Sequence, residues 1–133
     1  MSELVYLDTN IYISYFRQET DSLRPLGDFA FELLRKTLSC SYTLVLSSWV
    51  LTELSSKIDE RTLSEFVFEF KKQQKVVFVG VDESDFVLAK SFPRWPDRLH
   101  ELLAHKAGAR YLVTRNMKDF VGDLVELKFP ENL

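Results

Sequence analysis

The stretch LVYLDTN at residues 4–10 decides the fold. Its first four residues are apolar and suited to a buried strand, and an aspartate, a threonine and an asparagine follow at once. Short apolar runs of this kind alternate along the chain with longer segments of helical period, which is typical of βαβ units and a mainly parallel sheet. Ligands of such sheets bind beyond the carboxyl ends of the strands, so Asp8 lies where a site is expected.

The same alternation predicts the other elements. Further strands are expected at 43–47, 76–81 and 111–114, with a candidate edge strand at 124–128. Helices are expected at 10–16, 22–38, 48–58, 61–73, 83–91 and 97–107, and a helical turn at 117–120. Two prolines force a bend at 92–96, and Gly108 suits the end of a helix. The sequence therefore predicts an α/β fold that forms one domain over residues 1–133.

Composition sets few limits on function. The chain has 133 residues, of which 46% are hydrophobic and 28% charged, as in an ordinary folded domain. Its net charge of −3 gives no basic field over the whole chain, so contact with nucleic acid needs a local basic patch or metal ions. Cys40 is the only cysteine, and we find neither a signal peptide nor an apolar run long enough to span a membrane. We therefore expect a cytoplasmic protein without a membrane partner.

Acidic residues follow several of the predicted strands. Asp8 and Asp97 taken singly are more often helix caps, and Glu53 taken singly is more often an exposed helix residue. Asn116 and Asp119 lie on the turn after the strand at 111–114, where either is a cap or a solvated side chain. If the sheet is wound as predicted, however, these side chains converge on one edge, where carboxylates repel one another unless a cation neutralises them. Oxygen ligands without cysteine favour Mg²⁺ or Mn²⁺ over zinc.

Four segments together resemble the PIN-domain nucleases of the VapC type, which are the toxin half of many prokaryotic toxin–antitoxin pairs. They are YLDTNIYI (6–13), SSWVLTEL (47–54), DRLHELLA (97–104) and YLVTRNMKDF (111–120). The resemblance implies a three-layer α/β/α sandwich around a central, mainly parallel sheet, a cluster of acids that binds Mg²⁺ or Mn²⁺, and cleavage of RNA.

The resemblance also implies roles for single residues. Asp8, Glu53 and Asp97 match the first three acids of the family. Many relatives have Thr-x-Asp at the end of the last core strand, where this chain has Thr-Arg-Asn at 114–116. Asn116 would then offer a neutral oxygen, and Asp119, one helical turn later, the missing charge.

In a metal-dependent cleavage, Asp8 and Asp97 would bind the first ion, and Glu53 would bind metal or orient the attacking water. Asn116 and Asp119 would complete a second, weaker site. Hydrogen bonds from two further residues, Asn10 and Thr114, would hold the carboxylates in position.

Basic and aromatic residues near the acids are candidates for contact with RNA. The basic ones are Arg94, Arg98, Arg115 and Lys118. Trp49 and Trp95 could stack on a base, although Trp49 lies in an apolar run that favours the core. We expect His100 to be packed or solvated, with no part in the chemistry.

The segment LSEFVFEF at 63–70 carries more apolar residues than one core-facing stripe needs. The surplus indicates a dimer interface or an antitoxin groove, and relatives of the VapC type usually form homodimers. Two alternatives remain open beside the toxin. One is a PIN domain that acts in RNA processing or quality control without an antitoxin, and the other is a catalytically weak domain that binds RNA or protein. A phosphoacceptor receiver domain is disfavoured, because the strand at 111–114 is followed by Arg115 instead of lysine.

Overall fold

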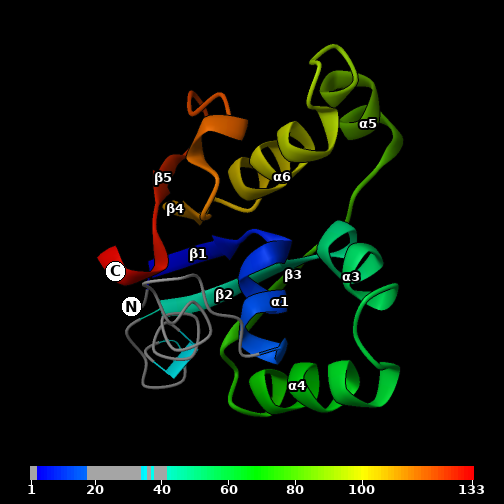
Figure 1. Ribbon diagram of the computed structural model, residues 1–133, viewed down its shortest axis with the longest axis vertical. Coiled ribbons are helices and arrows are strands. Elements are labelled where there is room, and N and C mark those ends of the chain that lie inside the picture. Colours follow the sequence, from blue (N-terminus) through cyan, green and yellow to red (C-terminus); the bar gives the residue numbers. More distant parts are fainter. Residues whose placement is uncertain (1–2, 18–33, 36, 38–41) are drawn as a thin grey trace.

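The computed structural model describes residues 3–17, 34–35, 37 and 42–133, and everything below refers to this part of the chain. Five parallel strands form one sheet in the order β3-β2-β1-β4-β5 (Figure 1). The strands are β1 (Glu3–Leu7), β2 (Tyr42–Ser47), β3 (Val76–Val79), β4 (Tyr111–Val113) and β5 (Glu126–Lys128). The predicted parallel sheet is confirmed, including its edge strand.

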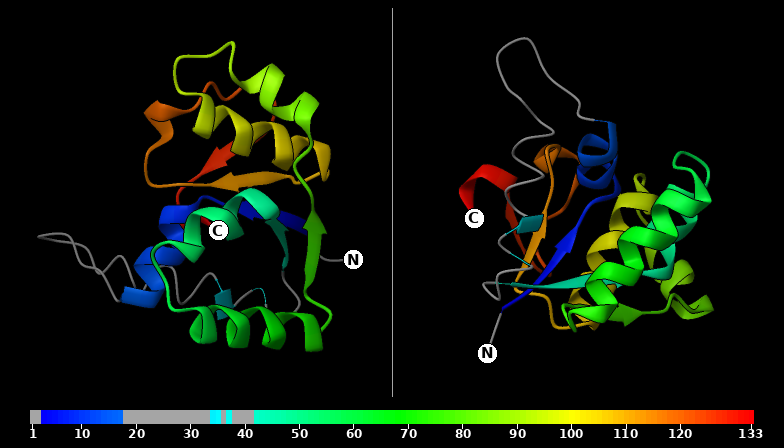
Figure 2. Two further views of the ribbon diagram at one scale, coloured as in Figure 1. Left: turned by 90° about the vertical axis from the view of Figure 1, so that its right-hand side faces the viewer. Right: turned by 90° about the horizontal axis from the view of Figure 1, so that it is seen from below.

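Helices flank this sheet. They are α1 (Thr9–Arg17), α3 (Ser48–Ser55), α4 (Glu60–Lys72), α5 (Glu83–Ala89) and α6 (Trp95–Lys106), with short 3-10 turns at Met117–Asp119 and Pro130–Asn132. In Figure 1 and in the left-hand view of Figure 2, α5 and α6 lie above strands β1 and β4, and α4 lies below the sheet. The α/β/α class is therefore confirmed. Most of the helix predicted at 22–38, and Cys40, lie outside the described residues.

The three middle strands read as unbroken apolar runs because both of their faces are covered. In β1, Val5, Tyr6 and Leu7 have no exposed surface, and the same holds for Leu112 and Val113 in β4. Strand β3 lies at the edge of the sheet, and there Val77 and Phe78 are 40% and 50% exposed. None of the described helices is long and apolar enough to cross a membrane.

Three predicted helix boundaries were wrong by two residues or more, and one of them is the end of α5, at Ala89 instead of residue 91. Helix α3 ends at Ser55 instead of residue 58. Helix α6 begins at Trp95, with Arg94 as its cap residue, because a proline is tolerated in the first turn, where no backbone N–H is needed. Asp97 therefore lies within the first turn of α6 and is not its cap.

The winding of the chain fixes where a site can form. Strands β1, β2 and β3 are added outward to one side, and the chain then returns to place β4 on the other side of β1. This reversal creates a switch point between the carboxyl ends of β1 and β4, which is where open α/β sheets bind ligands. Asp8 directly follows β1, and Thr114 directly follows β4.

Candidate functional site

Asp8 lies at the switch point, held by the strand beside it. Its backbone N–H donates to the carbonyl of Val113 at 2.9 Å, and the Thr114 hydroxyl donates to Asp8 Oδ2 at 3.0 Å. The backbone N–H of Asn116 donates in turn to the Thr114 hydroxyl at 3.0 Å. The side chain of Asp8 is buried, and burial raises its pKa against the opposing effects of His100 and Thr114. The structure thus places Thr114 where it holds the Asp8 carboxylate.

Glu53 reaches the same edge from α3 and is held by two partners. Thr9 Oγ1 donates to Glu53 Oε1 at 2.5 Å, and His100 Nε2 lies 2.7 Å from the same oxygen. Burial acts to raise the pKa of Glu53, but the hydrogen bonds from His100 and Thr9 and the interaction with His100 outweigh it, so that this pKa is lowered. Glu53 is therefore an ionised carboxylate with Oε1 occupied and Oε2 left for a ligand.

His100 is the centre of a buried run of hydrogen bonds. Its Nδ1 lies 2.6 Å from the hydroxyl of Tyr6, which lies 2.7 Å from Ser47 Oγ. Because an ionised Glu53 only accepts, Nε2 carries the proton between them. His100 is 1% exposed, and its Nε2 lies 3.9 Å from Asp8 Oδ1. It is packed, which is one of the two environments expected for it, but it contacts Glu53 and lies near Asp8, so it belongs to the site.

Asp97 comes to this edge from the first turn of α6. Partial burial and the negative charges of Asp8 and Asp119 raise its pKa from the ordinary 3.8 to about 6, against the opposing effects of His100 and Arg94. Asp119 lies on the turn after β4, where its carboxylate is 3.5 Å from Arg94 Nη1. Asp8 and Asp119, from two other parts of the chain, therefore both act electrostatically on Asp97 at the switch point.

These acids have the chemistry of a site for a hard divalent cation. All are oxygen donors, and a bound cation would remove the repulsion that raises the pKa of Asp97. In the part of the chain that the structure describes, no three acid, histidine or cysteine side chains are close enough to hold an ion as they stand. Binding therefore requires side-chain movement, for which Asp97 and Asp119 are only partly buried.

The two asparagines of the predicted site face a neighbouring pocket. A cavity of about 380 Å³ is lined by Asn10, Ile13, Ser14, Arg17, Lys57, Arg115 and Asn116. Among the described residues Asn10 makes no hydrogen bond to a carboxylate, which differs from the role expected for it. The pocket nevertheless adjoins the acids, since Asn10 and Asn116 each follow a site residue by two positions. Its cationic residues are Arg115, which the sequence had suggested for contact with RNA, and Arg17 and Lys57, which it had not, although Lys57 follows Glu53 by only four residues.

The four basic residues proposed to contact RNA have different surroundings. Arg94, which is 66% exposed, and Lys118 line an open cleft of about 280 Å³ beside Asp119. Arg98 is instead buried: it donates to Asp123 at 2.6 Å and lies 3.6 Å from Glu101. Arg115 is 10% exposed and lies 2.6 Å from Glu131. The structure corrects the surface position expected for Arg98, because this side chain is needed to neutralise buried charge.

From the sequence, His100 was given no part in the chemistry, and its partners Tyr6 and Thr9 were not named as site residues. One signal was present, since His100 follows Asp97 by three residues and so lies on the same face of a helix. The other partners could not be found, because Tyr6 reads as an ordinary strand residue and Thr9 as a cap.

Comparisons with known proteins agree with this geometry at the level of the fold. No protein-family model matches the chain, and no curated protein matches it either. One similar solved structure is that of VapBC2 from Rickettsia felis bound to a DNA fragment from their promoter. The match has a TM-score of 0.60 at 18% identity and covers 95% of this chain and 98% of the other. A second is FitAcB from Neisseria gonorrhoeae, with a TM-score of 0.58 at 17% identity, covering 97% and 99% of the two chains. The resemblance drawn from the sequence is thus confirmed for the architecture, and this chain has the PIN-like fold.

Proposed function

We propose that this chain is a Mg²⁺- or Mn²⁺-dependent endoribonuclease and the toxin of a VapBC-type pair. One observation carries the proposal: Asp8 and Asp119 both act electrostatically on Asp97 at the switch point of the sheet, with Glu53 hydrogen-bonded to His100 beside them. A fold alone permits many functions, and an acid cluster alone has many explanations. The combination of this fold with acids at this edge is what favours a metal-dependent nuclease.

Each acid then has a task in the hydrolysis of a phosphodiester. Mg²⁺ or Mn²⁺, when bound, supplies positive charge for the phosphoryl group and activates water. Asp8, fixed by Thr114, and Asp97 hold the ion. Glu53 directs its free Oε2 at the attacking water and accepts its proton, because Oε1 is held by Thr9 and His100. Asp119 and Asn116, on the turn after β4, assist in binding metal.

The pocket beside the acids suits the phosphates of the substrate. Arg17 and Lys57 supply positive charge, and Asn10 and Asn116 supply amide donors, in a protein whose net charge is −3. Phosphate contacts of this kind position a nucleic acid without reading its sequence. We therefore assign the sugar–phosphate backbone of RNA to this pocket.

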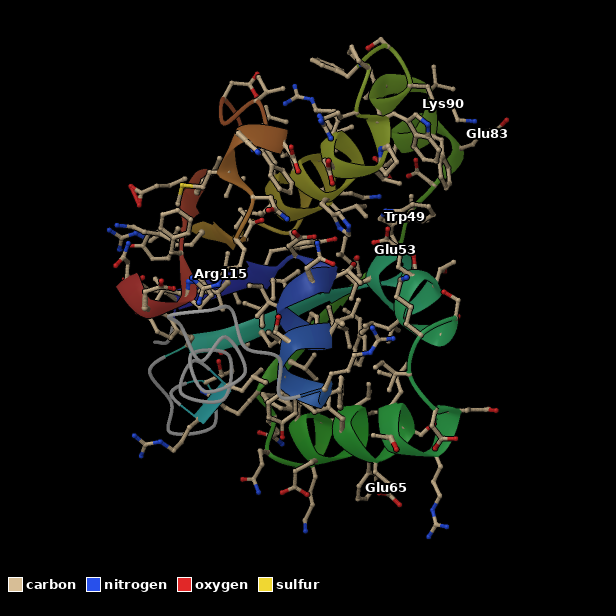
Figure 3. The ribbon with its side chains drawn as sticks, in the orientation of Figure 1. Trp49, Glu53, Glu65, Glu83, Lys90 and Arg115 are labelled. Carbon is tan, nitrogen blue, oxygen red and sulfur yellow. The ribbon has the colours of Figure 1, made fainter. Side chains whose placement is uncertain are left out.

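The test compares wild type with Asp8→Asn and with Glu65→Gln, a control. Glu65 is an exposed carboxylate on α4, far from the acids (Figure 3), and within the described part of the chain it forms an ion pair with Arg61. Each protein is incubated with single-stranded and structured RNA in Mg²⁺, in Mn²⁺ and in chelator. We expect wild type and Glu65→Gln to cleave only with metal, and Asp8→Asn to lose orders of magnitude in rate. Cleavage by Asp8→Asn at the rate of the control would refute the assignment.

Binding without turnover is the second candidate function, and two contacts favour it. Arg94 already neutralises Asp119, and Glu53 already has one oxygen occupied. If folded wild type binds RNA equally well in metal and in chelator and cleaves none of it, this candidate replaces the nuclease.

A partner protein is also part of the proposal. The matched structures are named as pairs, VapBC2 and FitAcB, which supports an antitoxin for this chain. For the homodimer, the relevant surface lies on α4, where Phe70 is buried but Phe68 is 65% exposed. Phe68 borders a groove of about 390 Å³ with Leu51, Leu63 and Val67. We assign this groove to a second copy of the chain.

Sedimentation of the purified protein tests the dimer. We expect wild type to be dimeric and Phe68→Ser to be monomeric, because apolar area at the interface is lost. The control is Val121→Ser, which removes another exposed apolar side chain, 55% exposed, from a different segment. A monomeric wild type, or a dimeric Phe68→Ser, would exclude the α4 interface.

A further inference from the structure

Both tryptophans of the chain lie beside the acid site. Trp49 precedes Glu53 by four residues, so the two side chains share a face of α3, as Figure 3 shows. Trp95 opens α6 two residues before Asp97. The two helices that bring acids to the switch point therefore each bring an indole as well.

The two indoles form one cluster with Phe86 of α5. The ring centres of Trp49 and Trp95 are 5.8 Å apart at an interplanar angle of 41°. Phe86 lies 5.9 Å from Trp49, edge to face, and 6.3 Å from Trp95. All three side chains are only partly buried, so part of this aromatic surface faces solvent.

A lysine side chain lies next to two rings of the cluster. Lys90, the C-cap residue of α5, is exposed, and its Nζ lies 5.5 Å from the ring centre of Trp95 and 5.9 Å from that of Phe86. Aromatic rings with a lysine alongside are the parts from which proteins build sites for single-stranded nucleic acid, because any base can stack on a ring while the cation meets the phosphate.

Packing alone accounts poorly for this cluster. An apolar core is filled economically by aliphatic side chains, whereas a tryptophan in a core needs a partner for its N–H. The Nε1 of Trp49 is buried and has no hydrogen-bond partner among the described residues. Leaving a buried donor unpaired lowers the stability of the fold, so packing alone does not explain why an indole stands here.

We propose that Trp95, backed by Trp49 and Phe86, stacks an unpaired base of the RNA next to the cleaved phosphate, and that Lys90 binds an adjoining phosphate. This inference rests on the proposed nuclease function and adds a subsite for one base of the substrate. Bases of a duplex stack on one another and offer no free face to a ring, so the cluster selects against paired RNA.

Tryptophan fluorescence tests the inference directly, because the chain has two tryptophans and both belong to the cluster. The protein is the double variant Asp8→Asn, Trp49→Phe, which leaves Trp95 as the only tryptophan. It is titrated with a single-stranded oligoribonucleotide, an abasic oligomer of equal length and charge, and a duplex, while the anisotropy of labelled RNA reports binding separately. We expect saturable quenching by the single strand alone. Binding of the single strand without quenching, or equal quenching by the abasic oligomer, would overturn the inference.

Paired substitutions separate stacking from packing. Trp95→Leu keeps an apolar side chain without an aromatic face, and Trp95→Phe keeps a face. We expect Trp95→Leu to bind the single strand about 5- to 100-fold more weakly, Trp95→Phe to recover most of the affinity, and neither to change binding of the abasic oligomer. Equal affinity of Trp95→Leu and wild type for the single strand would contradict stacking.

The experiments distinguish an error in the stacking site from an error in the proposed nuclease function. Metal-dependent cleavage by wild type without base-dependent quenching overturns only the stacking site. Base-dependent quenching without cleavage overturns only the nuclease and leaves a site that binds single strands.

Discussion

His100 joins three elements of the site through buried hydrogen bonds. It contacts Tyr6 of β1 on one side and Glu53 of α3 on the other, while it belongs to α6 itself. Because Glu53 is also held by Thr9, its carboxylate has one orientation relative to Asp8. His100 is therefore a positioning residue, which acts on the reaction through Glu53.

Substitution of His100 should lower the rate of cleavage while leaving RNA binding unchanged. For His100→Ala we expect kcat to fall about 10- to 100-fold, as is usual when a residue that supports a ligand is lost, with little change in KM. Tyr6→Phe, which removes only the outer hydrogen bond, should cost less. The control is His105→Ala, an exposed histidine on the same helix. The positioning role is refuted if His100→Ala and His105→Ala give the same kcat.

Single residues were predictable where their place in an element decides their role. Asp8 is such a case, because the end of a central parallel strand is a place for ligands. His100 and Glu101 were not predictable, since helical period alone suggests that two adjacent polar residues are exposed. Both are buried because distant segments satisfy them: Tyr6 and Glu53 bond His100, and backbone N–H groups bond Glu101.

At the scale of elements, Glu101 ties α6 to the segment after the short turn that carries Asp119. Its two oxygens accept from the backbone N–H groups of Val121 at 3.0 Å and Gly122 at 2.8 Å. Arg98, which lies 3.6 Å from the same carboxylate, donates to Asp123 on that segment. The segment that positions Asp119 thus depends on a carboxylate that itself touches no substrate.

Loss of this carboxylate should destabilise the whole protein. We expect Glu101→Gln to lower the free energy of unfolding by about 1–3 kcal/mol, because one acceptor is lost and buried Arg98 loses a charge partner. The control Glu65→Gln, on an exposed face, should stay within about 0.5 kcal/mol of wild type. Urea unfolding measures both, provided that the slope with urea is unchanged. Equal midpoints for the two variants would refute the role assigned to Glu101.

The type of each described element was predictable, but several ends were not. Buried strands such as β1 and β4 read as apolar runs because both of their faces are covered. The start of α6 was missed because Pro96 reads as a break, although a proline in the first turn costs the helix no hydrogen bond. That difference of two residues moves Asp97 from a capping position to an inward-facing first turn, which matters for the site.

At the scale of the whole molecule, the winding of the sheet brings like charges together. Asp8, Asp97 and Asp119 are far apart in sequence, and they meet because β4 returns to the side of β1. From the sequence, the convergence of these acids was expected only on the condition that the sheet is wound as predicted. The sequence could not predict that Arg94 pairs with Asp119, since such contacts depend on side-chain packing.

This arrangement predicts how pH and metal together change thermal stability. The pKa of Asp97 is raised from 3.8 to about 6 in the folded protein, so between these values the folded state holds a proton that the unfolded chain releases. The contribution of Asp97 to the stability of the metal-free protein therefore falls as pH rises through that window. A divalent cation binds the deprotonated acids, so millimolar Mg²⁺ or Mn²⁺ should raise Tm more at pH 7.5 than at pH 5.

The control for this prediction is Asp97→Asn, which removes the titrating group and one ligand of the cation. Other carboxylates act in the opposite direction, such as Asp123, whose pKa is lowered by the hydrogen bond from Arg98, so only the difference between wild type and variant isolates Asp97. Thermal unfolding followed by circular dichroism gives the four Tm values for each protein. In the variant we expect the pH dependence and the shift with metal both to shrink. A cation bound at Asp97 must compete with the proton on that carboxyl, whose pKa is raised by Asp8 and Asp119. A metal-induced shift in Tm that is equal at the two pH values, or equal in wild type and variant, would therefore mean that the cation binds elsewhere.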